Sequence, residues 1–346
     1  MVDLDPVQRP KFTPWVEKYR PSKVEEVSHQ LEVVAALRKS IQTGQVPHLM
    51  FYGPPGTGKT STILALSKEL FGGEFFKQRV IELNASDERG IAVVREKVKK
   101  FAQRKIAKHP DSNFNCPSIQ IVILDEADSM TIDAQAALRR IIEQYSSNTR
   151  FCIICNYISK IIDPLASRCV KFRFSPIARD AQIDRLKFIC EKENVKVESD
   201  DVFQSLVDIS AGDLRRSINT LQTASTFKQN NITKRDIESI SGIVPHEFII
   251  KVEQIISNTD GFSDVQFLTQ ELLWEGFDVQ QVIYQILDHL MSNPKLSDLK
   301  KARLSEIIAE TDVKLIQGGD EEINLLYTLS SVSRIIKVKN KHGSHQ

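Results

Sequence analysis

The 346-residue sequence lacks several features that would place it in a specialised class of protein. Its five cysteines are odd in number and widely scattered, which argues against a disulfide framework. No apolar run approaches the roughly 20 residues that cross a bilayer, and the N-terminal stretch has no signal-peptide core. With 41% hydrophobic and 26% charged residues, the composition is typical of a soluble globular protein. We therefore expect no membrane partner.

The formal net charge is only +1 at pH 7. No global positive field would draw in nucleic acid, so any surface that binds DNA has to gather its basic groups locally.

Two of the cysteines, Cys152 and Cys155, form a C-x-x-C pair within the apolar run 151–155. No second pair of Cys or His residues has the spacing of a zinc site. We interpret the cysteines as core residues of a protein in a reducing compartment rather than as a metal or redox site.

The first half of the chain alternates two patterns. The apolar segments that favour strands are 48–52, 79–83, 119–124, 151–155 and 170–174. The amphipathic segments that favour helices are 31–41, 60–70, 91–101 and 133–143. Apolar strands that alternate with helices predict an α/β fold, with a parallel sheet covered by helices on both faces.

From about residue 176 the pattern is helical only. The expected helices are 181–193, 200–210, 213–226 and 234–241, followed by about five more between 245 and 338. We therefore expect an α/β domain at 1–176, a small helical domain at 177–243, a helical C-terminal domain at 244–338 and a flexible tail at 339–346.

The strongest chemical signal runs from Gly53 to Thr60 and matches G-x-x-x-x-G-K-[ST] between an expected strand and an expected helix. Glycines allow backbone N–H groups to converge on phosphate oxygens, and the helix N-terminus adds a favourable dipole. Lys59 should reach the β- and γ-phosphates, and the Thr60 hydroxyl should bind Mg²⁺. The pattern predicts a site for ATP and Mg²⁺.

A second signal follows 65 residues after Thr60, where an apolar strand ends at Asp125 and Glu126. Ligands bind at this end of the strands in open α/β sheets. Asp125 suits contact with Mg²⁺, and Glu126 suits polarising the attacking water. Asn156 ends the next strand and could orient that water, although an Asn in such a place is most often a turn residue.

Residues 125–128 also spell DEAD, which raises a DEAD-box RNA helicase as an alternative. Such helicases need a second RecA-like domain, which the all-helical second half of this chain cannot supply.

Four further segments carry a family resemblance: 14–21 (PWVEKYRP), 84–90 (NASDERG), 167–169 (SRC) and 212–216 (GDLRR). With the P-loop, they make the chain similar to AAA+ sliding-clamp loaders, and specifically to the small subunits of replication factor C. The resemblance covers residues 12–335 and is closest to the subunit-2 and subunit-4 type.

The resemblance implies roles around the chain's own nucleotide. Segment 14–21 would lie over the base, with Val16 and Arg20 near the adenine or ribose. Asn156 resembles sensor 1, and Arg215 resembles sensor 2, which touches the γ-phosphate. The residues that would wrap the phosphates are Gly53, Pro54, Pro55, Gly56, Thr57, Gly58, Lys59, Thr60 and Ser61.

Two more roles come from the resemblance alone. Arg168 is similar to an arginine finger that acts in trans on the ATP of a neighbouring subunit. Asn84 is similar to a switch residue that holds Glu126 away from water until DNA binds. Without the family, Arg168 and Arg215 would indicate surface salt bridges.

The expected helix 91–101 is basic, and Arg95 and Lys99 share one of its faces. Such a helix could follow DNA phosphates without reading bases, although a run of charges is usually just solvated. The apolar stripe that ends at Phe101 indicates core, although the family touches the clamp with the far end of this helix. The residues that we expect to bind DNA are Arg89, Arg95, Lys97 and Lys100.

The resemblance implies an ATPase subunit of a heteropentameric clamp loader. It would act in the nucleus with the other replication factor C subunits, the sliding clamp PCNA and primer–template DNA, in DNA replication and repair. Two alternatives stay open: a hexameric AAA+ remodelling enzyme, which the family segments disfavour, and a subunit that binds ATP without hydrolysing it. The presence of Lys59, Asp125 and Glu126 disfavours the second.

Overall fold

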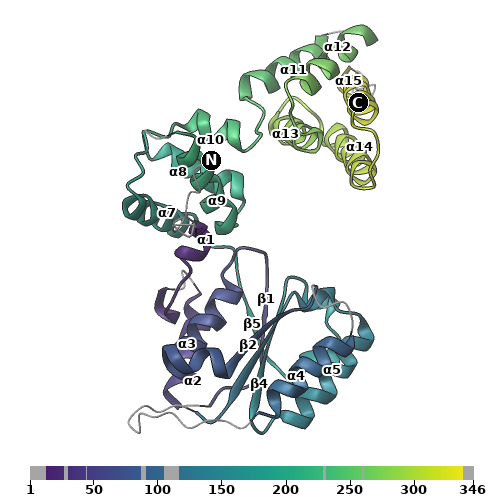
Figure 1. The fold of residues 1–346 in the computed structure, drawn as a ribbon. Coiled ribbons are helices and arrows are strands. Elements are labelled where there is room, and N and C mark those ends of the chain that lie inside the picture. Colours follow the sequence, from purple (N-terminus) through teal and green to yellow (C-terminus); the bar gives the residue numbers. More distant parts are fainter. Residues whose placement is uncertain are drawn as a thin grey trace, which may run out of the picture. The chain divides into compact units, whose positions relative to one another are not determined.

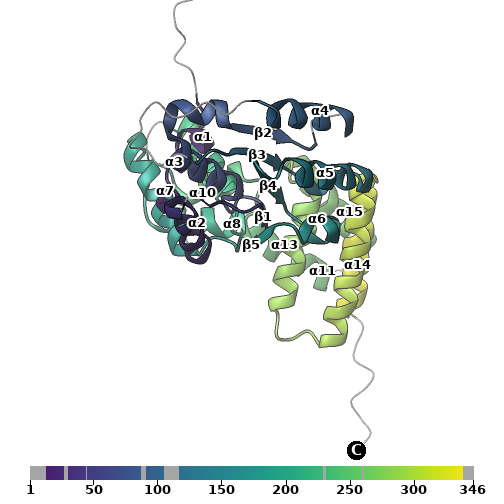
Figure 2. The same cartoon turned by 90° about the horizontal axis from the view of Figure 1, so that it is seen from below.

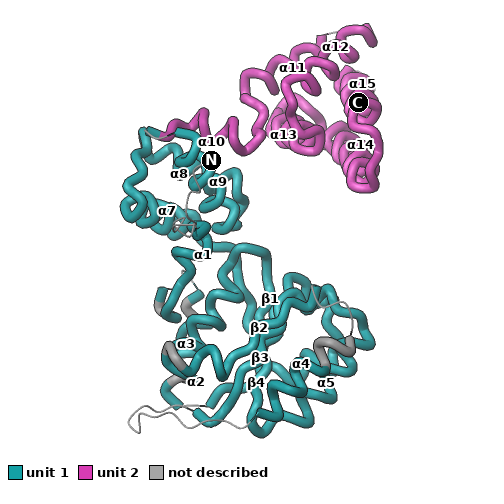
Figure 3. Tube along the Cα trace, in the orientation of Figure 1, with its two compact units in different colours: residues 1–231 teal, residues 232–346 magenta. Residues whose placement is uncertain are grey.

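The computed structural model describes residues 13–26, 30–43, 45–86, 91–104, 117–228, 231–258 and 261–337. The chain divides into two compact units, residues 1–231 and residues 232–346, which Figure 3 colours separately.

The first unit contains a five-stranded parallel sheet. Its strands are β1 (Leu49–Tyr52), β2 (Val80–Asn84), β3 (Gln120–Asp125), β4 (Thr149–Cys155) and β5 (Val170–Arg173). They lie in the order β2-β3-β4-β1-β5, which can be followed in Figure 2, and every pairing is parallel. The predicted parallel sheet is confirmed, and each strand starts and ends within two residues of its expected bounds.

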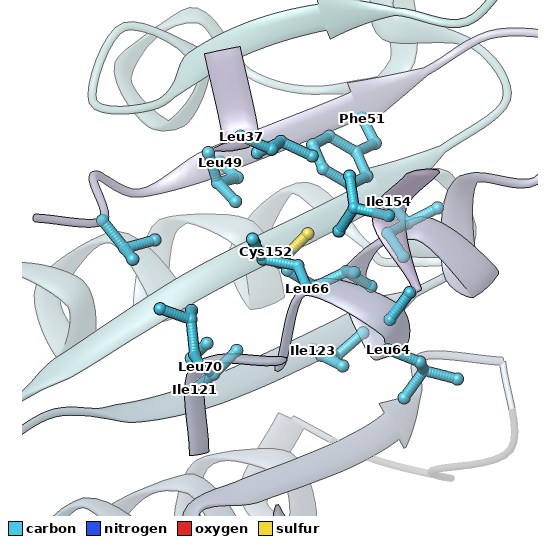
Figure 4. Close-up of a cluster of buried hydrophobic side chains, with 14 of the residues drawn as sticks. Leu37, Leu49, Phe51, Leu64, Leu66, Leu70, Ile121, Ile123, Cys152 and Ile154 are labelled. Atoms are coloured by element: carbon cyan, nitrogen blue, oxygen red, sulfur yellow. The ribbon is translucent and has the colours of Figure 1, made fainter. Parts of the chain in front are cut away.

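Helices cover both faces of this sheet. Figure 1 shows α2 (Leu31–Thr43) and α3 (Lys59–Arg79) on one side of the strands, and α4 (Ile91–Ala102) and α5 (Ile132–Tyr145) on the other. Successive strand residues point to opposite faces, so the inner strands supply buried residues to both cores. The buried strand residues on the α2–α3 side (Figure 4) are Leu49, Phe51, Ile121, Ile123, Cys152 and Ile154. Those on the α4–α5 side are Met50, Leu83, Val122, Leu124, Phe151, Ile153 and Cys155.

The same alternation separates the two cysteines of the C-x-x-C pair. Cys152 belongs to one core and Cys155 to the other, so their thiols lie on opposite faces of the sheet. Burial raises the pKa of Cys155 to about 12 and that of Cys152 well above its usual value. Both are free, buried core residues, as expected.

The helix after the P-loop is longer than predicted. We expected it to stop before Gly72, but α3 continues to Arg79 with a kink at Gly72, where φ is 72° and ψ is 162°. Glycine tolerates this left-handed φ, and the helix resumes after it. Arg79 is 3% exposed, and its Nη1 donates to the carbonyl oxygens of Pro117 and Ile119, each at 3.1 Å. These bonds fix the end of α3 beside the start of β3.

The first unit continues beyond β5 in three helices that pack on one another and form a lid. They are α7 (Arg179–Glu193), α8 (Asp201–Ser210) and α9 (Leu214–Phe227), all of which were predicted. A short helix that was not predicted, α1 (Trp15–Lys18), lies against α9.

In its described residues, the second unit contains helices and no β-strand, as expected. Its helices are α10 (Lys234–Ile240), α11 (His246–Asn258), α12 (Phe262–Trp274), α13 (Val279–Ser292), α14 (Asp298–Ile316) and α15 (Glu321–Lys337). The last five share one core, in which Leu268, Ile283, Leu304 and Leu329 are fully buried. Within the described ranges, no helix is both long and apolar enough to cross a membrane.

Candidate active site

The P-loop connects the end of β1 to the start of α3. Gly53, Gly56 and Gly58 have φ values of 142°, 70° and 90°, a region that L side chains rarely adopt. Gly53 also has no room for a side chain, because a Cβ there would lie 2.2 Å from the Phe174 carbonyl oxygen. The loop is therefore packed directly against the residue that follows β5.

Lys59 is the first residue of α3 and is 8% exposed. Its Nζ donates to the carbonyl oxygens of Gly53 and Pro54, both at 2.7 Å, and to Asn156 Oδ1 at 2.9 Å. Burial lowers the pKa of Lys59, while the carboxylate of Asp125 acts in the opposite direction. The structure thus joins the predicted P-loop lysine to Asn156, the polar residue that follows β4.

Asp125 ends β3, and its Oδ2 accepts a hydrogen bond of 2.6 Å from Thr60 Oγ1 in the first turn of α3. Carboxylate and hydroxyl oxygens are ligands that Mg²⁺ accepts. Among the described residues, no group of three or more His, Cys, Asp or Glu side chains could hold a metal ion. The pair therefore fits Mg²⁺ that takes its other ligands from water and from nucleotide phosphates.

Glu126 follows at once and has a left-handed backbone, with φ 54° and ψ 37°. A bulky residue at positive φ is uncommon and persists where its surroundings fix it. Here the Glu126 N–H donates to Asp125 Oδ1 at 2.9 Å, and its carbonyl oxygen accepts from Ser129 Oγ at 2.7 Å. The side chain is exposed and borders the same pocket as Asp125.

Asn84 ends β2 and pairs in register with Asp125. Its Oδ1 accepts from both the N–H and the Oγ of Ser86, each at 2.9 Å. The amide oxygen is thus engaged in its own turn, and residues 87–90 of the same segment lie outside the described residues. The switch role of Asn84 stays a prediction.

The P-loop, the strand ends and the lid enclose one pocket of about 260 Å³. The predicted residues that line it are Val16, Arg20, Pro55, Gly56, Thr57, Gly58, Lys59, Thr60, Ser61, Asp125, Glu126, Asn156 and Arg215. Gly53 and Pro54 do not line it, but their carbonyl oxygens hold the Lys59 ammonium.

Tyr19 and Pro21 also line the pocket and belong to segment 14–21, which was expected to lie over the base. Five lining residues were missed from the sequence: Glu26, Ile177, Arg185, Leu214 and Ile218. The spacing of Leu214 and Ile218, which puts both on one face of α9 beside Arg215, could have indicated two of them. For the others no local pattern marks a ligand.

The lid meets the P-loop at Gly56. A Cβ on Gly56 would lie 1.8 Å from Oδ1 of Asp213. The same Oδ1 caps α9 by accepting from the N–H groups of Arg215 and Arg216 at 2.9 and 3.3 Å. This contact, which only glycine fits, places the first turn of α9, and with it Arg215, beside the phosphate-binding loop.

Comparison with known proteins matches three parts of the chain to families. Residues 49–177 match the ATPase family associated with various cellular activities (AAA), and residues 184–226 match an RCF1/5-like AAA+ ATPase lid domain. Residues 245–331 match the replication factor C C-terminal domain. Replication factor C subunit 2 of Saccharomyces cerevisiae is 48% identical over 330 residues, 93% of each chain. Subunit 4 of Homo sapiens is 49% identical over 328 residues, 94% of this chain and 89% of that relative.

The chain belongs to the replication factor C family. The predicted resemblance to the subunit-2 and subunit-4 type is confirmed, and the AAA domain makes the chain an ATP hydrolase. A replication factor C C-terminal domain stands where a DEAD-box helicase would carry its second RecA-like domain, so that alternative is excluded.

A solved structure of the RuvB Holliday junction branch migration motor from Thermotoga maritima has a related fold. It superposes with a TM-score of 0.51, covering 75% of this chain and 86% of RuvB, at 14% sequence identity. At this identity the likeness supports the AAA+ fold of this replication factor C family member and nothing finer.

Arg168, the predicted arginine finger, does not line the pocket of its own chain. It follows the short helix α6 (Asp163–Ala166), and its guanidinium donates to the Pro164 carbonyl oxygen and pairs with Glu143 of α5. The two side chains are 35% and 43% exposed. In this replication factor C chain by itself, Arg168 forms a surface ion pair.

The predicted DNA-binding residues are only partly described. Arg89 and the side chain of Arg95 lie outside the described part of the chain. Lys97 and Lys100 are exposed on α4, and Nζ of Lys100 lies 4.0 Å from Oε2 of Glu96. Phe101, like Val98 one turn earlier, is buried in the core of the sheet, as expected for the apolar stripe of this helix.

The contact between the P-loop and the lid can be tested with two matched glycine substitutions in the nucleotide-free chain. Gly58→Ala meets no atom within 4 Å, so it should cost only the left-handed strain of about 1–2 kcal/mol. Gly56→Ala carries the same strain and also drives its Cβ into the Asp213 carboxylate. It should therefore lower the midpoint of urea unfolding clearly more than Gly58→Ala does. Equal midpoints for the two variants would contradict the close approach of α9 to the loop.

Proposed function

We propose that this chain is an ATPase subunit of a multisubunit clamp loader that opens the sliding clamp PCNA and loads it onto primer–template DNA. The observation that carries the proposal is the single pocket that joins Lys59, Thr60 and Asp125 to lid residue Arg215, in a chain similar to replication factor C subunits over 93% of its length. We place this activity in the nucleus, in DNA replication and repair.

We also propose a role for each of the three domains. Residues 1–176 bind nucleotide, residues 177–243 form the lid, and residues 244–338 form a collar that joins the subunits of a heteropentamer. The tail, residues 339–346, lies outside the described residues.

ATP binding would rearrange the bonds of Lys59. Its Nζ now donates to two P-loop carbonyl oxygens and to Asn156, and the oxygens of the β- and γ-phosphates would replace some of these acceptors. Arg215, held by the Asp213 cap, would donate to the γ-phosphate, where a guanidinium complements the charge that builds up during transfer.

The phosphoryl acceptor would be water, polarised by Glu126. Its exposed carboxylate borders the pocket next to Asp125, and Asn156 would help to orient the water. Mg²⁺ held at Thr60 and Asp125 would neutralise charge on the phosphate oxygens. Asn84, one strand away, would restrain Glu126 until DNA is bound.

DNA would meet the basic face of α4, where Lys97 and Lys100 are exposed, together with Arg89 and Arg95. Such contacts neutralise phosphates and carry no base specificity. Binding of this kind fits a loader that has to act at any primer–template junction.

Replacing the carboxylate of Glu126 by an amide should preserve ATP binding, because the phosphates are held by the P-loop and Lys59. Turnover at this site should fall by at least about 10²-fold in Glu126→Gln, the usual contribution of a general base. Single-turnover hydrolysis in the assembled complex measures the rate, with Glu247→Gln as the matched control on an exposed residue of α11. An unchanged rate would remove Glu126 from this role.

The trans role of Arg168 can be separated from its ion pair with Glu143. Arg168→Ala removes the guanidinium and should lower hydrolysis at the adjacent subunit by about 10³-fold or more, as for other trans arginine fingers. Glu143→Ala breaks the same ion pair but keeps the guanidinium, so the adjacent site should stay active.

Both variants should lose no more than about 1 kcal/mol of stability, because the pair is exposed. The measurement is site-resolved hydrolysis in complexes that carry one substitution each. Normal turnover at the neighbour of Arg168→Ala would contradict the finger assignment.

A further inference from the structure

Part of the pocket lining comes from residues 15–21, which we name the wall segment. It begins with α1, and Val16, Tyr19, Arg20 and Pro21 border the pocket. Beyond it, the Val24 N–H donates to Glu69 Oε1 of α3 at 2.6 Å. This hydrogen bond attaches the residues that follow the wall segment to α3, the helix that begins at the end of the P-loop.

The wall segment is bonded to the lid at both of its ends. The Trp15 N–H donates to Gln222 Oε1 of α9 at 3.0 Å. Near the other end, Arg185 Nη2 of α7 donates to the Tyr19 carbonyl oxygen at 2.6 Å, and the Tyr19 ring lies edge-on to Phe188 with centroids 6.2 Å apart. These contacts fix the backbone of the segment to the same helices that form the lid.

Glu193, the last residue of α7, makes the strongest side-chain connection. Its Oε1 accepts from Tyr19 Oη at 2.5 Å and from Lys18 Nζ at 2.6 Å, and its side chain is only 17% exposed. Burial alone would raise the pKa of Glu193, but these two hydrogen bonds outweigh burial and lower it. Hydrogen bonds to a charged acceptor are stronger than neutral ones, so one carboxylate ties two successive residues of the wall segment to the lid.

We propose that Glu193 is a positioning residue for nucleotide binding, which holds the base-side wall of the pocket on the lid. The inference rests on the proposed placement of the base beside Val16 and Arg20. Arg215, on α9 of the same lid, also lines the pocket, and its N–H donates to the Asp213 carboxylate that lies against Gly56 of the P-loop. The lid therefore carries the groups for both ends of the nucleotide, and it aligns the base wall whenever Arg215 engages the γ-phosphate.

The test compares the full chain's affinity for ATP with its affinity for inorganic tripolyphosphate, which has no base. Glu193→Ala should weaken ATP binding by about tenfold, the effect of losing a hydrogen bond to a charged group, while tripolyphosphate affinity changes less than about twofold. Glu193→Gln retains an oxygen acceptor and should restore most of the ATP affinity. Lys187 lies on the same helix as Glu193, and Lys187→Ala removes its 2.8 Å ion pair with Asp200, so this control should change neither affinity.

Should Glu193→Ala fail to fold, Tyr19→Phe is the second variant, because it removes only the hydroxyl that donates to Glu193. It too should weaken the binding of ATP more than that of tripolyphosphate. An equal loss for ATP and tripolyphosphate would overturn the proposal, because general damage to the lid would explain it. Val16→Ala separates this proposal from the placement of the base. If Val16→Ala weakens ATP binding and Glu193→Ala does not, only the role of Glu193 falls. If neither does, the base does not lie beside the wall segment.

Discussion

The backbone of the P-loop at Gly56 lies against the Asp213 carboxylate, in the space that a side chain would otherwise occupy. One oxygen of that carboxylate also caps α9 and so sets the position of Arg215. The phosphate loop and the first lid turn are thereby placed by a single contact. The remaining polar groups then approach from the strand ends: Asp125 bonds Thr60, and Asn156 bonds Lys59. The pocket lies where the sheet and the lid meet, and Gly56 is the P-loop residue at that contact.

Much of this arrangement could be predicted from the sequence, because its signals are local. The apolar strand segments gave the sheet to within two residues at each end, and the P-loop and the Asp125–Glu126 pair were found from their spacing. The rest depends on residues far apart in the chain. The bonds from Lys18 and Tyr19 to Glu193 span 175 and 174 residues, and no local pattern marks them. Gly72 is a different case. Glycines at positions 72 and 73 predicted a helix end, yet α3 is only kinked at Gly72 and continues to the buried Arg79.

The chain by itself assembles every polar group that we assign to its own nucleotide, while Arg168 stays outside that pocket in an ion pair with Glu143. This division has a physical consequence for a clamp loader. In the assembly that we propose, each subunit would bind ATP with its own P-loop and lid, and the transition state would take a cation from the next subunit. Hydrolysis would then be coupled to the geometry of the ring, which a clamp and DNA could change by binding one arrangement more tightly than another.

The most direct test of this account is the ATPase rate of the chain measured alone and in the complex with its partner subunits, each with and without PCNA and primed DNA. The account predicts slow hydrolysis by the isolated chain whatever is added, and a rate in the complex that rises when PCNA and primed DNA are both present. The same complex assembled with Glu126→Gln in this chain shows how much of the ATPase rate comes from this chain's own site. An isolated chain that hydrolyses ATP as fast as the stimulated complex would contradict the account.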